Sequence, residues 1–266
     1  MVNNYLTTFL YINSNNFLDG RANSVYELSV YRNLLYIPDY RNDKVIVVDI
    51  ETKKHVKDIA VPMPHGVEID ENGIVYISCY KKNRIHIHDG DREKEITYEK
   101  MDFPVSISAR KDKVYIANWG QGQRGGLLVA DKKFRSIEEF GRYEGRFKPH
   151  SILALDDGYV YVVNRGEPSI VVFDERGSLN RVHMLNKDFD PISLTAYNQW
   201  YIIPNYVDGM IYIFDKKFNV LGNFFGGDRY PMSTVVYDKK LFISEQDGNR
   251  IHSISLSNLK LILKTT

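Results

Sequence analysis

A short pattern recurs along this chain at intervals of about forty residues, and this recurrence restricts the folds that the chain can adopt. In five of the six copies an apolar run ends at an Asp. These residues are Asp49, Asp89, Asp131, Asp174 and Asp215. Upstream of each lies a Tyr-rich segment that ends at a polar residue. Strand-like units repeated at this period indicate a β-propeller.

The second copy shows how one unit is built. Residues 66–69 and 74–78 alternate like strands, and the turn between them carries Gly73, where a positive φ is expected. Residues 84–88 alternate again, and residues 95–98 form a weaker outer strand. No window carries a helical period that strand alternation does not explain better. The sequence therefore predicts an all-β, six-bladed propeller with four antiparallel strands in each blade.

We expect one domain over residues 1–266, because each blade buries its faces only against its neighbours and the ring must close. The predicted blades span approximately residues 23–62, 63–102, 103–147, 148–189, 190–229 and 230–266. Residues 6–12 alternate like a strand that has no unit of its own, so residues 1–22 are expected to close the ring against blade six. Residues 259–264 are expected to form that blade's own outer strand.

The composition of the chain bears on its possible partners and its cellular compartment. With 35 basic and 34 acidic side chains, the net charge of +1 gives no electrostatic footprint for nucleic acid. No segment approaches the roughly 20 apolar residues that span a bilayer. A single Cys forms no internal disulfide. The amino terminus lacks a secretory signal, which favours the cytoplasm for a whole chain, although a processed secreted chain would look the same.

The polar residues that end the Tyr-rich strands form a ring by repeat equivalence. They are Asp39, Cys79, Asn118, Asn164, Asn205 and Glu245. We interpret them as candidate ligand-binding residues at one channel mouth, where Glu245, Asn164, Asn118 and Asp39 offer oxygens that suit calcium. The alternative is that they cap strands and satisfy loop amides. Cys79 is either a nucleophile beside His65 or an inert buried thiol.

Two units open with a Pro-His pair, at Pro64-His65 and Pro149-His150. Both histidines begin innermost strands two blades apart, so both are expected near the central axis at the same mouth. They are either metal or ligand contacts, or hydrogen-bonded residues that line the channel. His86 and His88 alternate with isoleucines and share a blade face, so they either chelate or pack.

The Pro-His openings and the Tyr-rich strands resemble NHL repeats from about residue 24 to residue 256. Among such propellers the chain is most similar to peptidyl-α-hydroxyglycine α-amidating lyases. The resemblance implies zinc held by His65 and His150, and Arg41 as a candidate catalytic residue. The third ligand would fall at Met232, whose thioether is a poor zinc ligand. Ser233 replaces an acid of the family, and the loop at residues 118–126 lacks its catalytic Tyr.

Together these patterns predict a binding propeller that uses one channel mouth. The ligand would be a peptide, a small polar molecule or a protein, with zinc or calcium as candidate cations. Arginines in the loops make that rim basic, which suits a carboxylate or phosphate. One alternative is a metal-dependent lyase or hydrolase of the amidating-lyase or lactonase kind. The other is an interaction scaffold without chemistry.

Overall fold

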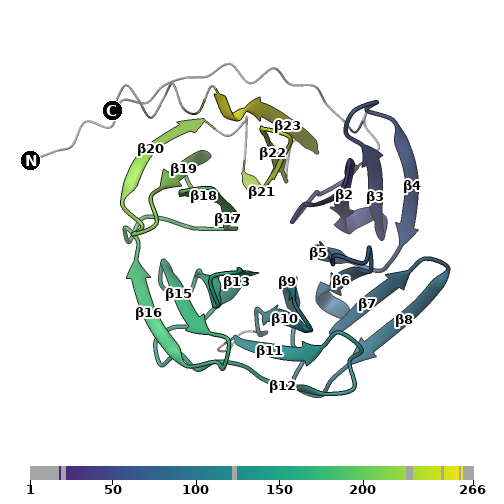
Figure 1. Cartoon of the computed structure of the whole chain (residues 1–266), viewed down its shortest axis with the longest axis horizontal. Helices are drawn as coiled ribbons and strands as arrows, with labels where there is room; N and C mark the ends of the chain where they lie inside the picture. Colours follow the sequence, from purple (N-terminus) through teal and green to yellow (C-terminus); the bar gives the residue numbers. More distant parts are fainter. Residues whose placement is uncertain are drawn as a thin grey trace, which may run out of the picture.

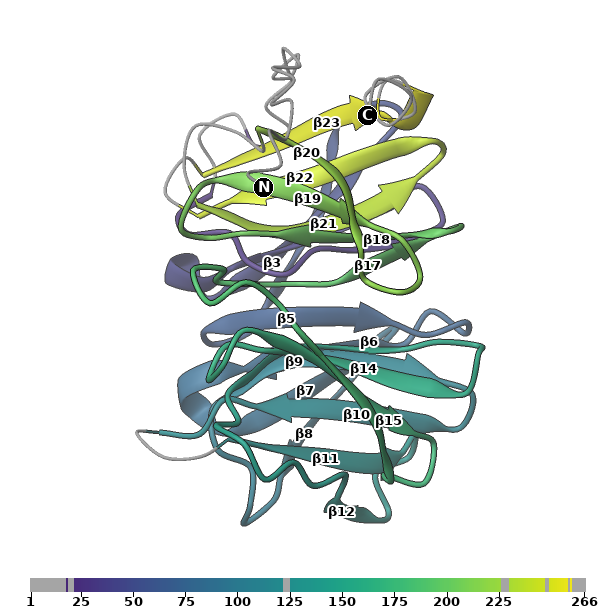
Figure 2. The same ribbon diagram turned by 90° about the vertical axis from the view of Figure 1, so that its left-hand side faces the viewer.

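Six antiparallel sheets stand around a central axis and confirm the predicted six-bladed propeller (Figure 1). The computed structural model describes residue 18 and residues 22–121, 125–225, 230–246, 249–257 and 259. Five sheets have four strands, and within the described ranges the sixth has three. The predicted closing strand at residues 6–12 and most of the outer strand predicted at 259–264 lie outside those ranges. Seen from the side, the strands run along the channel axis, so each inner strand has its ends at the two mouths (Figure 2).

Each blade is numbered in chain order from the axis outward. Blade one contains β1 Ser29–Tyr31, β2 Leu34–Asp39, β3 Lys44–Asp49 and β4 His55–Ala60. Blade two contains β5 Pro64–Ile69, β6 Val75–Cys79, β7 Arg84–Asp89 and β8 Arg92–Thr97. Blade three contains β9 Pro104–Arg110, β10 Lys113–Asn118, β11 Gly126–Asp131 and β12 Ile137–Glu139.

The second half of the ring repeats this order. Blade four contains β13 Pro149–Ala154, β14 Tyr159–Asn164, β15 Ser169–Asp174 and β16 Leu179–Met184. Blade five contains β17 Thr195–Tyr197, β18 Trp200–Pro204, β19 Met210–Phe214 and β20 Val220–Phe225. Blade six contains β21 Pro231–Tyr237, β22 Lys240–Glu245 and β23 Arg250–Ser255. Two short 3-10 helices, η1 Tyr40–Asn42 and η2 Tyr80–Lys82, follow β2 and β6.

The repeated Asp residues form the turns between third and fourth strands. Asp174 accepts hydrogen bonds from the backbone N–H groups of Arg176 and Ser178. Asp131 accepts from Lys133 and Ser136 in the same way, and these bonds lower its pKa to about 2. A carboxylate that accepts local N–H bonds fixes a tight turn. The sequence pattern therefore repeats because the hairpin turn repeats.

The hydrophobic core lies between the blades in six clusters, one at each blade-to-blade contact. Blades three and four share Tyr115, Phe140 and Phe173. Blades six and one share Phe242 and Leu35, each fully buried. Because every cluster needs two blades, no blade is stable alone and closure of the ring is required.

Side chains also join blade six to blade one. The Ser244 hydroxyl donates to the Tyr26 carbonyl at 2.9 Å, and the Leu28 N–H donates to the Ser233 hydroxyl at 3.1 Å. The first and last blades are thus connected within the described residues.

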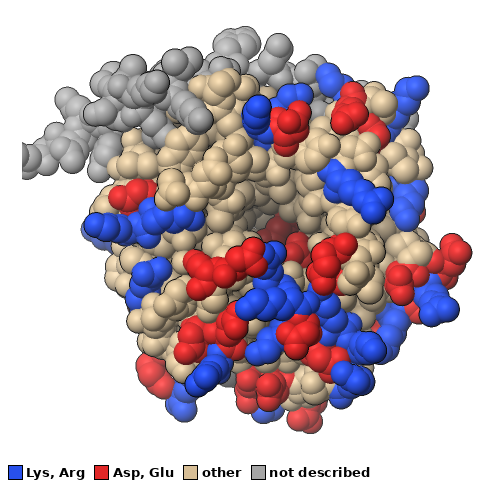
Figure 3. Space-filling view, in the orientation of Figure 1, with Lys and Arg blue, Asp and Glu red and all other residues tan. Residues whose placement is uncertain are grey.

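The face viewed down the axis is hollowed at its centre, and Lys and Arg are interspersed with Asp and Glu around it (Figure 3). Among the described residues, no helix has the length and apolar character needed to cross a membrane.

Candidate ligand pocket at the channel mouth

Both Pro-His pairs begin an innermost strand at a bulge. Pro64 pairs with Cys79 and Pro149 with Asn164, and the register shifts directly after each proline. A bulge re-aims the side chain of the extra residue. Here it places the His65 and His150 rings together at the mouth, with ring centroids 5.4 Å apart. Both residues are buried.

Each imidazole is fixed by the neighbouring blade. His65 Nδ1 lies 2.8 Å from the carbonyl oxygen of Val105, and His150 Nδ1 lies 2.9 Å from that of Ile192. A carbonyl only accepts, so both Nδ1 atoms carry the proton and donate. Each Nε2 then keeps its lone pair and has no hydrogen-bond partner in the described part of the chain.

Burial keeps both rings neutral. It lowers the pKa of His65 to about 4, with the positive charge of Arg165 as a smaller cause. Burial also lowers the pKa of His150 well below its usual value, and Arg165 and His65 add to this effect. At neutral pH the site therefore offers two nitrogen lone pairs as hydrogen-bond acceptors or ligands.

The residues that follow the polar ring make the pocket walls. They are Tyr40, Tyr80, Trp119, Arg165, Tyr206 and Gln246. Tyr26 is added from blade one, in the register position that His65 occupies in blade two. Its ring lies 4.3 Å from that of His65, and the Trp119 ring lies 5.6 Å from that of His150. The result is an aromatic-walled pocket of about 460 Å³.

Arg165 brings the pocket's main positive charge, and Asp190 neutralises it. The guanidinium donates through Nε and Nη2 to the two carboxylate oxygens, at 2.5 Å each. It also lies over the rings of Trp119 and Tyr206, at 5.6 Å and 5.5 Å from their centroids. Arg165 is therefore held rigidly as part of the wall.

The residues present do not complete a zinc triad. Met232 lines the same pocket and is buried, so its neutral thioether stands where the resemblance places the third ligand. Zinc prefers imidazole, thiolate or carboxylate. Arg41 lies in η1, is exposed, and is not part of the pocket lining. Its catalytic role stays a prediction.

The six polar ring positions are all buried, and most contact their own blade's loops. Asp39 accepts from the Asn23 N–H and the Asn42 side chain, and Asn164 accepts from the Lys148 N–H. The Asn118 side chain donates to the Lys100 carbonyl, and the Asn205 side chain accepts from the Asp190 N–H. Glu245 pairs with His252 at 2.9 Å.

These contacts are those expected of residues that cap strands.

Burial raises the pKa of the Cys79 thiol to about 12, which removes the thiolate that a nucleophile needs. The calcium ligand set of Asp39, Asn118, Asn164 and Glu245 stays a prediction, as does ligand binding by the ring as a whole.

Deeper in the channel lie two carboxyl groups that the sequence reasoning did not select. The Ser151 hydroxyl donates to Glu27 at 2.9 Å, and burial raises the pKa of Glu27 to about 8. Burial also raises the pKa of Glu68 to about 7. Gly66 is required here, because a Cβ would lie 2.7 Å from the Val105 carbonyl and 2.9 Å from the Glu27 carboxyl. Both acids line a second pocket of about 500 Å³.

One sequence signal could have found the aromatic wall. The residue directly after each polar ring position is aromatic in four of the six blades, at Tyr40, Tyr80, Trp119 and Tyr206. The pattern is visible in the printed sequence once the polar positions are aligned. It predicts a ring of side chains around the same mouth.

Comparisons with known proteins support the fold. No protein-family model matches the sequence, and no curated protein matches it. Among solved structures, a gluconolactonase from Xanthomonas campestris is similar with a TM-score of 0.76 at 13% identity, covering 90% of this chain and 88% of that chain. Regucalcin from Agrobacterium tumefaciens, a calcium-binding protein, is similar with a TM-score of 0.75 at 8% identity, covering 94% of this chain and 95% of that chain.

Virginiamycin B lyase from Staphylococcus aureus gives a TM-score of 0.71 at 14% identity, covering 90% of this chain and 82% of that chain. The finer resemblance to NHL repeats and amidating lyases stays a prediction. At these identities the similarity shows the fold alone: this chain is a six-bladed β-propeller that resembles gluconolactonase, regucalcin and virginiamycin B lyase.

Proposed function

We propose that this propeller binds a small hydroxylated molecule in the aromatic-walled pocket at the His65 and His150 mouth. The observation that carries the proposal is the pair of neutral imidazoles, each with a fixed Nδ1 proton and a free Nε2 lone pair. Lone pairs in a buried pocket accept hydrogen bonds from hydroxyl or amine groups of a ligand.

The walls define the rest of the ligand. Tyr26, Tyr80 and Trp119 offer flat apolar faces, which pack well against a sugar ring or an aromatic ring. Arg165 is paired with Asp190, which leaves Lys81 as the other charged residue of the lining and gives the pocket only a modest positive charge. A compact, mostly neutral molecule with hydroxyl groups and one flat face fits this combination.

Binding can be tested with a panel of neutral sugars, sugar lactones and aromatic glycosides. Thermal shift identifies ligands, and calorimetry measures Kd for the wild type, His150→Ala and Trp119→Ala. We expect each variant to weaken binding by about tenfold. His183→Ala, on the outer strand β16, is the control and should keep wild-type affinity. Equal affinity in all four proteins would contradict the proposal.

The second candidate is an enzyme of the lyase or lactonase kind that acts in the same pocket. It is supported by the accessible Nε2 atoms, which can take a proton from a bound substrate. The lowered pKa of each imidazole keeps it in its base form at neutral pH. Because the donor set lacks a third zinc ligand, no step is assigned to a metal.

Gluconolactone and virginiamycin B, which the names of the similar enzymes supply, are the first substrates to assay. Reactions should be run with and without added divalent cations. Turnover that disappears in the His65→Ala and His150→Ala double variant would establish the enzyme. Ligand binding without turnover would instead support the first proposal, a propeller that binds its ligand without catalysis.

A further inference from the structure

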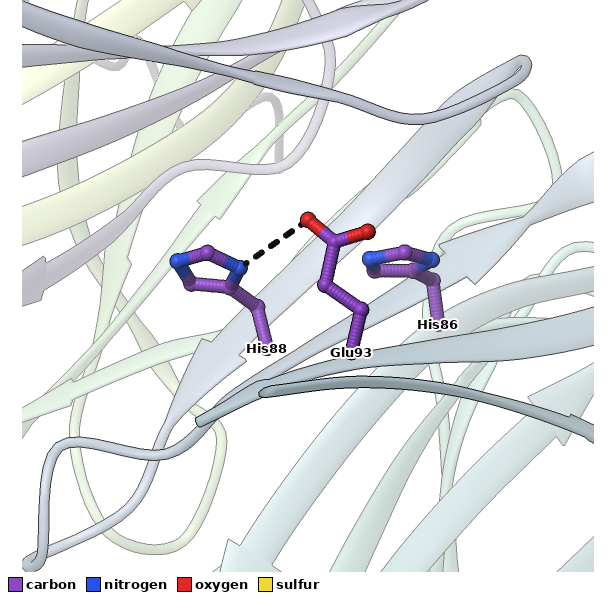
Figure 4. Close-up of side chains that lie close together, drawn as sticks. All are labelled: His86, His88 and Glu93. Atoms are coloured by element: carbon purple, nitrogen blue, oxygen red, sulfur yellow. Dashed lines mark ion pairs between the residues drawn. The ribbon is translucent and has the colours of Figure 1, made fainter. Parts of the chain in front are cut away.

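A second group of histidines lies far from the channel, on the outer part of blade two. His86 and His88 alternate along β7, so both side chains leave the same face of the sheet. In the antiparallel pairing with β8, His88 is directly opposite Glu93. Figure 4 shows the Glu93 carboxylate between the two imidazole rings. One ligand atom from each residue lies within 4.8 Å of the others.

His86 is the residue that needs an explanation. It is 5% exposed, and neither ring nitrogen has a hydrogen-bond partner among the residues described. Buried polar atoms in native proteins are nearly always paired, because an unpaired one loses its water without replacement. An imidazole that only fills space could be replaced by an apolar side chain at no such cost.

His88 is already oriented toward Glu93. Its Nδ1 lies 3.4 Å from a Glu93 oxygen, and its Nε2 lies 3.3 Å from the Lys57 ammonium of blade one. An ammonium group only donates, so Nε2 accepts and Nδ1 faces the carboxylate. A metal ion between Nδ1 and the carboxylate would replace the Nδ1 proton, so Nε2 would then carry the proton and the Lys57 ammonium would have to move away.

We propose that His86, His88 and Glu93 form a site for a divalent transition metal of the zinc class. Two imidazoles and one carboxylate are donors that zinc accepts, whereas calcium and magnesium prefer all-oxygen sites. Water would complete the coordination from the solvent side, since the Glu93 side chain is 56% exposed. This site is independent of the proposed function at the mouth.

The arrangement needs only a small closure to hold the ion. Zinc bonds of about 2.0–2.1 Å place neighbouring ligand atoms roughly 3.3 Å apart. The present spacing of up to 4.8 Å closes if the two imidazole rings turn toward each other and the exposed Glu93 side chain moves toward them. The ion would then join β7 to β8 across the turn at residues 90–91 and stabilise the outer edge of blade two.

Some charges around the site attract a cation and others repel it. Glu95, opposite His86, adds negative charge on the same face but is paired with Arg84 at 2.5 Å. The Lys57 ammonium repels a cation. Removing it by Lys57→Met should therefore tighten metal binding by about threefold.

The test uses the full chain, stripped with a chelator and dialysed. Cobalt is titrated first, because its visible absorption reports tetrahedral coordination, and zinc affinity follows by competition. We expect a single equivalent with micromolar affinity in the wild type. Glu93→Gln, an exposed change that leaves the fold intact, should weaken binding by about tenfold or more, as should His86→Ala.

Two controls locate the site. Glu139→Gln, an exposed glutamate on β12 of blade three, should bind as the wild type does. The His65→Ala and His150→Ala double variant should also keep this affinity, which separates the outer site from the mouth. Absence of cobalt absorption in the wild type, or equal affinity in Glu93→Gln and the wild type, would overturn the proposal.

Discussion

His65 donates from Nδ1 to the carbonyl oxygen of Val105, the second residue of β9, which is the innermost strand of the next blade. His150 repeats this bond to Ile192. The two histidines therefore connect blades two to three and four to five at the same mouth. Each of these side chains helps to hold the ring together through Nδ1 and offers its Nε2 to a ligand.

Because of that connection, we expect His65→Ala to destabilise the fold as well as alter the pocket. The change removes a buried hydrogen bond and leaves the Val105 carbonyl with fewer donors, which costs about 1–3 kcal/mol. The melting temperature should fall by about 2–4 °C for each kcal/mol lost. His55→Ala, on an exposed pair with Asp58, is the control and should change it little. Equal melting of the two variants would show that the inter-blade bond contributes nothing.

The channel acids should make stability depend on pH. In the folded chain the pKa of Glu27 is about 8 and that of Glu68 about 7, both raised by burial above 4.5. The folded state holds these protons more tightly than the unfolded state, so their stabilising effect is complete below about pH 4.5. It is lost as the pH rises through 7 to 8.

Melting curves between pH 5 and pH 9 check this dependence. Above about pH 6.5, where His65 and His150 are neutral in both the folded and the unfolded state, the wild type should lose stability as the pH rises, and Glu27→Gln should lose less, because its amide does not ionise. Glu139→Gln, an exposed change on blade three, should follow the wild type. A Glu27→Gln profile parallel to that of the wild type would mean that Glu27 ionises as an exposed acid does.

The period of the repeat was enough to predict the fold, and the Pro-His pairs were enough to predict that His65 and His150 meet. Both follow from repeat equivalence, which fixes where a residue lies around the axis. The third ligand beside His86 and His88 could not be found in this way. Glu93 reaches them through the register of β7 with β8, and the sequence did not specify that register. Glu27 could not be predicted either, because it is distinguished only by its burial in the channel and belongs to no sequence motif.

The pair of Arg165 and Asp190 should set the charge preference of the mouth. Asp190→Asn removes the carboxylate that neutralises the guanidinium, so Arg165 becomes free to pair with an anionic ligand. We expect a ring-shaped carboxylate to bind about tenfold tighter to this variant, and the gain to shrink at high salt. Calorimetry at two salt concentrations measures both effects. Unchanged affinity would show that the guanidinium cannot reach the pocket interior.

The mouth lacks a third zinc ligand beside its two histidines. Met232 lines the pocket that contains His65 and His150, and a histidine there would restore three imidazoles from alternate blades. Met232→His should tighten zinc binding at the mouth by at least about tenfold, or about 1.4 kcal/mol. The comparison belongs in a Glu93→Gln background, so that the outer cluster of blade two does not mask the change. Zinc titrations of the two proteins at fixed pH decide the matter. Equal affinities would mean that the two Nε2 atoms do not converge on a common point with position 232, and the Pro-His pairs would then serve the ring and its organic ligand alone.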